Sequence, residues 1–287
     1  MASWFSKSPE KLVQSANKLK QQQQWLQAGD EFCEAAVLYK SKDEVEVANC
    51  LRDAANCYIK VDERYAIMAM EAAAIIESEQ GKFQYSAELH KNIAELALSL
   101  DRKKPRIDNW LSIGGALDMK SKSRFGQFGQ SSRSMSATRL AVQHLEKAAT
   151  YFNSEGGPAN EADCFAQMAE LLADSGDLVE AAEIYDKLVE LAWKHEFLAL
   201  GAKTYAFRAC LCRLAAGLEL RMDEMEKRCP SLTGSDECTL VKSLDEACDS
   251  ATVDAAIRQF GRLNQADEWT KRRLDAVRGK RAGPRLA

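Results

Sequence analysis

The chain has 287 residues, 46% apolar and 29% charged, which is enough to build one large domain or two small ones. Ala and Glu are abundant, whereas the alternating Val, Ile and Thr of strands are scarce, which argues against a β-rich protein and predicts an all-α fold. The net charge of −4 conceals basic segments at 101–139 and 271–287, with nine and seven Lys or Arg against three and one acids. Such segregation favours charged partners, although a basic end is often simply solvated.

The nine cysteines and the apolar runs argue against two further classes of protein. Lys7 and Lys11 interrupt the first turns, so we expect no signal peptide and no disulfide scaffold. Five cysteines fall on apolar helical faces, where we expect buried thiols of a reducing compartment: Cys33, Cys50, Cys57, Cys164 and Cys210. The longest apolar run, 65–76, contains Glu71 and is too short to cross a bilayer, so membrane contact must be peripheral.

Two large aromatic side chains, Trp4 and Phe5, precede the first helical pattern. They can staple onto the first helix near Leu12. Alternatively, they can bury themselves in an apolar surface supplied from outside the chain. Residues 1–8 are therefore treated as a separate apolar segment.

Residues 9–216 repeat a helical pattern in which alanine recurs at a regular spacing. The markers are separated by 20, 18 and 21 residues and then by 21, 19 and 21: Ala28, Ala48, Ala66 and Ala87, then Ala141, Ala162, Ala181 and Ala202. Such helices bury their apolar faces only by stacking on their neighbours. Polar and mostly glycine-bearing stretches mark the expected turns: 61–64, 78–83, 153–160 and 173–178. We predict a TPR-like right-handed superhelix of antiparallel helical hairpins, in which alanines let the backbones approach.

The repeat fails at about 101–137, which we predict to be a basic insert. One short helical pattern follows Pro105, and the Gly, Ser and Gln that come next predict a flexible loop. A tolerated surface insertion is favoured over a phosphorylated loop or a contact with lipid headgroups or an acidic partner.

Residues 217–287 carry shorter and more polar helical patterns, which predict a C-terminal helical bundle that caps the superhelix. A Ser or Asp N-cap begins the segment after Pro230. The chain ends in a basic tail, GKRAGPRLA.

Sequence motifs for catalysis are absent: there is no GxxxxGK[ST], GxGxxG, HExxH or GxSxG. The three histidines, His90, His144 and His195, are widely spaced, and no zinc spacing occurs. A scaffold that binds other proteins is therefore a better hypothesis than an enzyme. A cluster of shifted ionisable groups in a deep pocket would favour an enzyme instead.

Several ordered stretches carry a resemblance to a known family: WLQAGDEFCEAA (25–36), KVDERYAI (60–67), GKFQYSAELHKNIAEL (81–96), AKTYAFRACLCRL (202–214), PSLTGSDEC (230–238) and ADEWTKRRL (266–274). In this order and spacing the chain resembles the soluble NSF attachment protein (SNAP) family, α-type. Members of that family are adaptors that couple an NSF-type AAA ATPase to SNARE bundles.

The resemblance implies a membrane contact at Trp4 and Phe5, because SNAP adaptors carry an exposed apolar loop near the N-terminus. Tryptophan prefers the membrane interface, and a single weak anchor allows reversible binding. Lys7 adds attraction to anionic lipid. The helix that precedes this loop in the family has no counterpart in this sequence.

The resemblance also implies a basic concave face that binds the acidic SNARE bundle. The cations that match the family or stand one turn away are Lys42, Lys82, Lys91, Lys203 and Arg208. The chain departs from the family at Glu88, Asp163 and Gln167, where the family has lysines. These departures imply weakened or altered choice of SNARE, and ordinary solvated charge is the alternative at each cation.

The resemblance further implies an ATPase-contacting end, which Glu246, Asp249 and the penultimate Leu286 match. Ser250 replaces a third family acid, and the tail around Leu286 is basic where the family's is acidic. The ATPase contact is therefore altered, or the partner has a different surface.

As a whole, the resemblance implies a non-enzymatic adaptor for SNARE disassembly in vesicle fusion and intracellular protein transport. Its partners would be a syntaxin-type SNARE complex, an NSF-type ATPase and a membrane surface, with no cofactor, metal, nucleic acid or small-molecule substrate. Its location would be cytoplasmic and peripheral, on the cytosolic face of secretory-pathway membranes. The alternative is a diverged TPR-like scaffold with another client.

Overall fold

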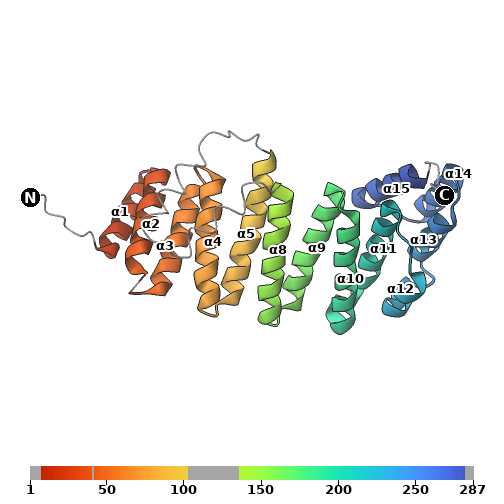
Figure 1. Ribbon diagram of the computed structural model, residues 1–287, viewed down its shortest axis with the longest axis horizontal. Coiled ribbons are helices and arrows are strands. Elements are labelled where there is room, and N and C mark those ends of the chain that lie inside the picture. Colours follow the sequence, from red (N-terminus) through yellow and green to blue (C-terminus); the bar gives the residue numbers. More distant parts are fainter. Residues whose placement is uncertain (1–7, 41, 103–135, 282–287) are drawn as a thin grey trace, which may run out of the picture. The chain divides into compact units, whose positions relative to one another are not determined.

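The structure, a computed structural model, describes residues 8–40, 42–102 and 136–281. Within these ranges every regular element is a helix (Figure 1). The chain forms two compact units, Met1–Gly157 and Pro158–Ala287.

Unit 1 is a row of helices in which each one packs on the next in the sequence (Figure 1). Its helices are α1 (Pro9–Gln21), α2 (Trp25–Tyr39), α3 (Glu44–Tyr58), α4 (Glu63–Glu79), α5 (Phe83–Arg102) and α8 (Ala137–Ser154). Asp43 and Asp62 begin α3 and α4, because their carboxylates accept hydrogen bonds from backbone N–H groups of the first turn. Gly81, with φ +73°, allows the sharp turn that ends α4.

Small residues occupy the positions where the helices of unit 1 cross. The alanine markers of this unit are at most 1% exposed: Ala28, Ala48, Ala66, Ala87 and Ala141. At Gly29 the approach is closest, because an added Cβ would lie 2.5 Å from the ring of Tyr58. The Tyr58 hydroxyl donates a 2.7 Å hydrogen bond to Asp30, which holds that ring against the glycine.

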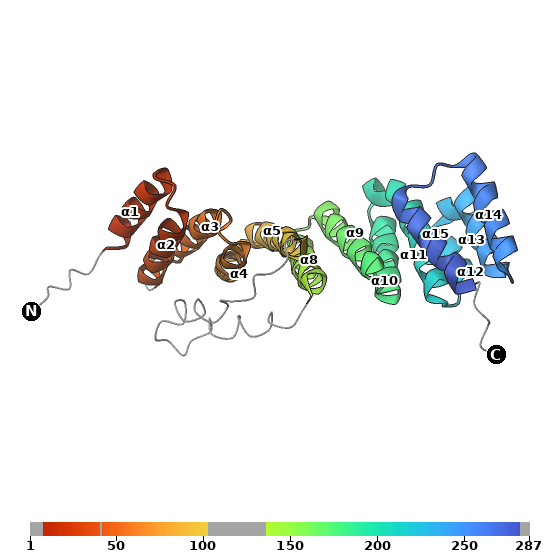
Figure 2. The same cartoon turned by 90° about the horizontal axis from the view of Figure 1, so that it is seen from above.

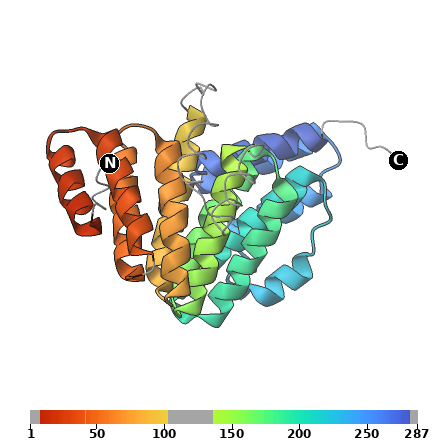
Figure 3. The ribbon, with the colours of Figure 1, turned by 60° about the vertical axis from the view of Figure 1, so that its left-hand side comes forward.

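Unit 2 continues the hairpin pattern and adds a helical bundle. Its elements are α9 (Pro158–Ser175), α10 (Leu178–Lys194), the 3-10 turn η2 (Glu196–Leu198), α11 (Ala199–Ala216), α12 (Met222–Arg228), the 3-10 turn η3 (Pro230–Leu232), α13 (Asp236–Glu246), α14 (Ser250–Leu263) and α15 (Glu268–Arg281). α10 packs between α9 and α11, as Figure 3 shows from a second side. Seen from above in Figure 2, α15 runs across α11, on which it packs.

The predicted all-α, TPR-like arrangement of helical hairpins is confirmed within each unit. Ala162 and Ala181 are buried as expected, but Ala202 is half-buried, because it lies in the first turn of α11, next to the exposed turn that joins α10 to α11. The predicted division at 216 and 217, the insert and a single right-handed superhelix stay predictions. Most of the insert, 103–135, lies outside the described residues.

The cysteines behave as small apolar side chains. None of the nine forms a disulfide; seven are buried, Cys33 is half-buried and Cys248 is exposed. Among the described residues, no helix is both long and apolar enough to cross a membrane.

A buried histidine pair joins α5 to α8 in unit 1. The Nδ1 atoms of His90 and His144 lie 2.8 Å apart, so one ring must donate a proton to the other. His144 Nε2 lies 3.2 Å from Glu71 on α4, and Tyr151 stacks on His90 with ring centroids 5.7 Å apart. Burial, the facing His144 and the nearby Lys147 lower the pKa of His90 to about 3.

We predict that Gly29→Ala destabilises the protein by about 1–3 kcal/mol, because the new methyl group must displace the hydrogen-bonded Tyr58 ring. The matched control is Gly261→Ala on α14, where an added Cβ has open space. That change should stabilise the protein by roughly 0.5–1 kcal/mol through helix propensity. Urea unfolding followed by circular dichroism measures both, and equal effects would contradict the packing argument.

We predict that the free energy of unfolding falls as the pH drops from about 6.5 towards 3, with a slope for His90 approaching ~1.4 kcal/mol per pH unit. The sign follows because the pKa of His90 is lowered in the folded state, so the unfolded chain binds the proton first. His90→Asn keeps a polar group near the Nδ1 position and should flatten the slope between about pH 6.5 and 5. Urea titrations across this range with identical slopes for both proteins would refute the assignment.

Candidate functional site

The cations of unit 1 that the resemblance singled out lie at different kinds of position. Lys42 is exposed in the turn before α3, and its backbone N–H donates to Tyr39 O at 2.7 Å. Lys91 is half-buried on α5, one turn after the exposed Glu88. Both cations can meet a partner, and Lys42 presents the freer surface.

Lys82 belongs to a charged cluster that the sequence did not indicate. Glu77 is only 2% exposed and forms a 2.9 Å ion pair with Arg52. Burial raises the pKa of Glu77, and the charges of Arg52 and Lys82 oppose this rise. The Arg52 guanidinium also lies 5.7 Å from the ring centroid of Tyr85, which is 57% exposed. Lys82 therefore partly compensates a buried carboxylate.

In unit 2, Lys203 forms an ion pair across two helices. Its Nζ lies 2.8 Å from Glu237 on α13, and its side chain is 39% exposed. Burial alone would raise the pKa of Glu237. Hydrogen bonds from the Lys203 side chain and from the backbone of Glu237 itself outweigh burial, so this pKa is lowered overall. Lys203 thus joins α11 to the bundle while keeping part of its surface in solvent.

Arg208 is held more tightly than Lys203. Its two terminal nitrogens lie 2.5 Å from Glu170 on α9 and 3.1 Å from Asp267, the residue before α15. Its guanidinium covers Trp269 at 4.8 Å from the ring centroid, and its side chain is only 15% exposed. Arg208 therefore ties α11 to α9 and to the start of α15.

Trp269, at the start of α15, has two guanidinium groups over its ring. Arg273 approaches its ring at 5.5 Å and also forms a 3.0 Å ion pair with Asp174 on α9. The edge of Trp269 meets Tyr185 on α10, with centroids 5.8 Å apart. Burial alone would raise the pKa of Asp267, but hydrogen bonds from Thr270 and the interaction with Arg208 outweigh this effect. The pKa is therefore lowered overall, and the carboxylate stays ionised. These contacts fix α15 to the hairpins.

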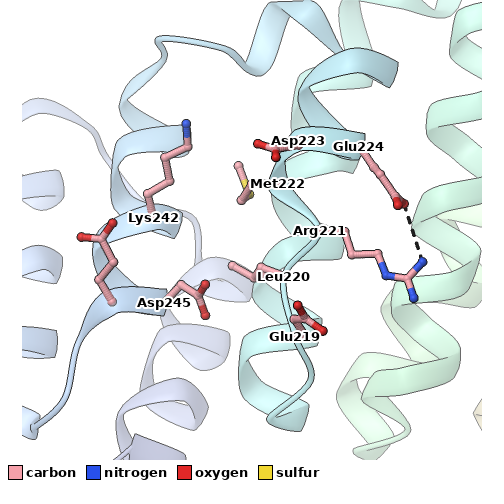
Figure 4. Close-up of a pocket in the computed structure, with 9 residues that line it drawn as sticks. Glu219, Leu220, Arg221, Met222, Asp223, Glu224, Lys242 and Asp245 are labelled. Carbon is pink, nitrogen blue, oxygen red and sulfur yellow. Dashed lines mark ion pairs between the residues drawn. The ribbon is translucent and has the colours of Figure 1, made fainter.

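The predicted ATPase-contact acid Glu246 lines a surface hollow of about 430 Å³ between the segment before α12 and the end of α13 (Figure 4). Acids outnumber bases around it: Glu219, Asp223, Glu224, Asp245 and Glu246 against Arg221 and Lys242. Arg221 pairs with Glu224 at 3.7 Å, and Lys242 pairs with Glu226 at 2.7 Å. The hollow therefore keeps an acidic surface.

Asp249 has a structural role as the N-cap of α14. It forms a capping box with Thr252, and hydrogen bonds from the Thr252 backbone and side chain lower the pKa of its carboxyl. It is exposed, so a partner can still reach it. The membrane-contact residues Trp4 and Phe5 and the penultimate Leu286 lie outside the described residues.

Two of the three departures from the expected pattern, Asp163 and Gln167, interact with each other. Gln167 donates a 3.0 Å hydrogen bond to Asp163, one turn earlier on α9. Across the described ranges, no group of three or more His, Cys, Asp or Glu side chains is arranged to hold a metal ion.

Comparison with known proteins decides the family. A family model described as "Soluble NSF attachment protein, SNAP" matches residues 2–110 and 115–281. The chain belongs to the soluble NSF attachment protein family. Its match includes most of the predicted insert, so that stretch has a counterpart in the SNAP family.

Individual SNAP relatives are distant but cover most of the chain. Mouse "Alpha-soluble NSF attachment protein" is 25% identical over 264 residues, 90% of this chain and 78% of the relative. Bovine "Beta-soluble NSF attachment protein" is 26% identical over 267 residues, 91% and 78% of the two chains. A "Probable vesicular-fusion protein sec17 homolog" from Neurospora crassa is 22% identical over 274 residues, 92% and 82% of the two. These names describe attachment and vesicle-fusion proteins.

We predict that Arg208→Ala lowers the free energy of unfolding by about 1–3 kcal/mol, because it leaves two carboxylates and the Trp269 face without their cation. Arg208→Lys should recover only part of this loss, since an ammonium cannot bridge both carboxylates in a fork. Lys203→Ala, the matched control on the same helix, should cost no more than about 1 kcal/mol. Thermal melting and urea unfolding rank the three, and equal losses for the two alanine variants would contradict the proposed role of Arg208.

Proposed function

We propose that this chain is a SNAP-type adaptor that binds assembled SNARE complexes and recruits an NSF-type AAA ATPase to take them apart. The observation that carries the proposal is the SNAP family match, which spans both units. Catalysis would belong to the ATPase, and this chain would recruit it and transmit force. The paired helices supply a stable surface on which charges keep fixed positions.

The proposed SNARE-binding surface uses Lys42, Lys82, Lys91, Lys203 and Arg208. The exposure of Lys42 and the partial exposure of Lys82 and Lys203 support direct contact with an acidic bundle. Arg208 is already neutralised by Glu170 and Asp267, so its contribution would be mainly to position α11. Steering between such surfaces should weaken as salt increases.

The proposed ATPase contact uses Glu246 and Asp249, together with Leu286. The exposed acids around the hollow support a contact with a basic surface on the ATPase. Because the tail around Leu286 is basic, this part of the contact would be altered, or the partner would have a different surface.

Trp4 and Phe5 are proposed to contact the bilayer beside the SNARE complex, on the cytosolic face of secretory-pathway membranes. Their large apolar side chains in a short N-terminal segment support a shallow, reversible anchor.

A second candidate is a diverged helical scaffold with another client. Its support is the internal neutralisation of Arg208 and the acids or amides where the family has lysines. In this case the SNARE bundle would not be retained, and Lys82→Glu with Lys203→Glu would leave client binding intact.

We expect the protein to support ATP-dependent disassembly of a SNARE complex when an NSF-type ATPase is supplied. On liposomes, Trp4→Ser with Phe5→Ser should slow disassembly severalfold, because the membrane anchor is lost, whereas disassembly in solution should stay unchanged. Lys82→Glu with Lys203→Glu should slow disassembly in both settings by reversing charge on the SNARE-binding surface. Release of SNARE subunits from a labelled complex measures the rates.

Retention of neither the SNARE complex nor the ATPase by the wild-type chain would refute the adaptor. If the Trp4 and Phe5 changes leave disassembly on liposomes unaffected, the adaptor proposal stands. The two aromatic side chains would then pack on the first helix and not contact the membrane. Circular dichroism of each variant separates loss of binding from loss of fold.

A further inference from the structure

The end of α15 is fixed near the acidic hollow that lies between the segment before α12 and the end of α13. A Cβ added at Gly217, the residue after α11, would lie 2.8 Å from Cε of Lys280, so this lysine packs over the end of α11. Glu219, which lines the hollow, comes only two residues after Gly217. Arg278 forms a 2.6 Å ion pair with Asp254 on α14, the helix that follows the other wall of the hollow. The chain beyond α15 therefore starts beside the hollow.

The hollow keeps negative charge that nothing in it neutralises. Its two bases, Arg221 and Lys242, are both held in ion pairs with other acids. Leu220 and Met222 also line the hollow, so apolar surface lies beside the carboxylates (Figure 4). Within the described residues, three of its exposed acids form no ion pair: Glu219, Asp223 and Glu246. A segment that fills the hollow would therefore combine positive charge with an apolar side chain.

The sequence that follows α15 has this chemistry. Residues 282–287, which we call the tail, read AGPRLA and lie outside the described residues. Gly283 and Pro284 disfavour a continued helix and favour a turn. Arg285 supplies a cation, and the next residue, Leu286, supplies a large apolar side chain. An extended stretch of this length spans roughly 20 Å, which is enough to return to the adjacent hollow.

We propose that the tail folds back into the acidic hollow of its own chain. Arg285 meets the unpaired carboxylates, and Leu286 lies on the apolar surface beside them. A segment tethered this closely has an effective concentration of roughly millimolar, so it fills the hollow before a dilute partner does. Because Glu246 lines the hollow, the tail masks the proposed ATPase contact until the ATPase displaces it. This masking rests on the proposed function, whereas the contact between tail and hollow does not.

Two other occupants suit the hollow less well. A divalent cation needs converging ligands, and the described residues contain no group of three or more His, Cys, Asp or Glu side chains arranged to hold a metal ion. The tail of a second copy would have to find the hollow at its concentration in solution, whereas the chain's own tail is attached beside it.

Disulfide trapping in the full chain tests the contact. Cys248 is exposed and lies two residues after Glu246, so it can react with a cysteine introduced into the tail by Ala287→Cys. Copper–phenanthroline oxidation should join the two within one chain, at a rate that does not depend on protein concentration. Glu219→Gln with Glu246→Gln should slow this trapping roughly fivefold, because it removes the attracting charge. Salt at about 1 M should slow it as well.

The matched control is Glu183→Gln with Glu196→Gln, which removes two exposed acids that do not line the hollow. Its trapping rate should equal that of the parent. Cys248→Ser should abolish trapping, which identifies the cysteine that reacts. All the acids changed are exposed, so the melting curves of these proteins should coincide.

The effect on the ATPase is measured separately. Arg281→Gln with Arg285→Gln removes charge from the end of the chain and keeps Leu286. Binding of an NSF-type ATPase to the chain on a SNARE complex should rise roughly threefold, because the tail no longer competes for the acids. Unchanged binding would overturn the masking.

Equal trapping rates for the hollow variant and its matched control would overturn the tail contact. Cross-links that form only between chains, faster at higher protein concentration, would also overturn it and would assign the tail to a second copy. A chain that is trapped as expected but never retains the ATPase would support the tail contact and refute the proposed function. A chain that retains the ATPase but is never trapped would refute the tail contact alone.

Discussion

Close approach of helix backbones is the constraint on which the rest of this structure depends. A single amphipathic helix cannot hide its apolar stripe, so each helix of a hairpin array must be covered by the next one. Alanine at the crossings brings the axes near enough for this to happen without voids. The contact of Gly29 with the Tyr58 ring is the limiting case, since even one methyl group does not fit. The spacing of helices, and with it the position of every surface charge, depends on these small residues.

Charge in this protein is divided between the fold and the surface. Arg208 and Arg273 enclose Trp269 and reach carboxylates on α9, so they hold α15 against the hairpins. Lys42 does not hold helices together in this way, because it lies exposed in a turn. A change of charge at Arg208 therefore acts through stability as well as through recognition, whereas a change at Lys42 acts mainly through recognition. Binding data on these cations can be understood only beside unfolding data.

The sequence predicted the helices and their crossings well, because alanine spacing and apolar periodicity are local signals. It did not predict the His90–His144 hydrogen bond, since the two residues are 54 apart and nothing in either neighbourhood points to the other. It named Lys82 but missed Glu77, whose burial depends on how α3 and α4 pack. Arg208 was predicted as a surface cation, although its partners come from two distant parts of the chain, Glu170 on α9 and the start of α15. Each missed feature is a contact between distant segments.

Trp193 and Trp269 show why exposure could not be read from residue type. Both tryptophans lie near helix ends. From residue type alone, a large apolar side chain in a helix is expected in the core. Trp269 is 6% exposed because Tyr185 of α10, Arg208 of α11 and Arg273 of its own helix surround its ring. Trp193 is 67% exposed because the hairpin turns at the next residues and no described helix continues over it. The neighbouring elements, not the residue type, make one tryptophan a support for the fold and leave the other available to a partner.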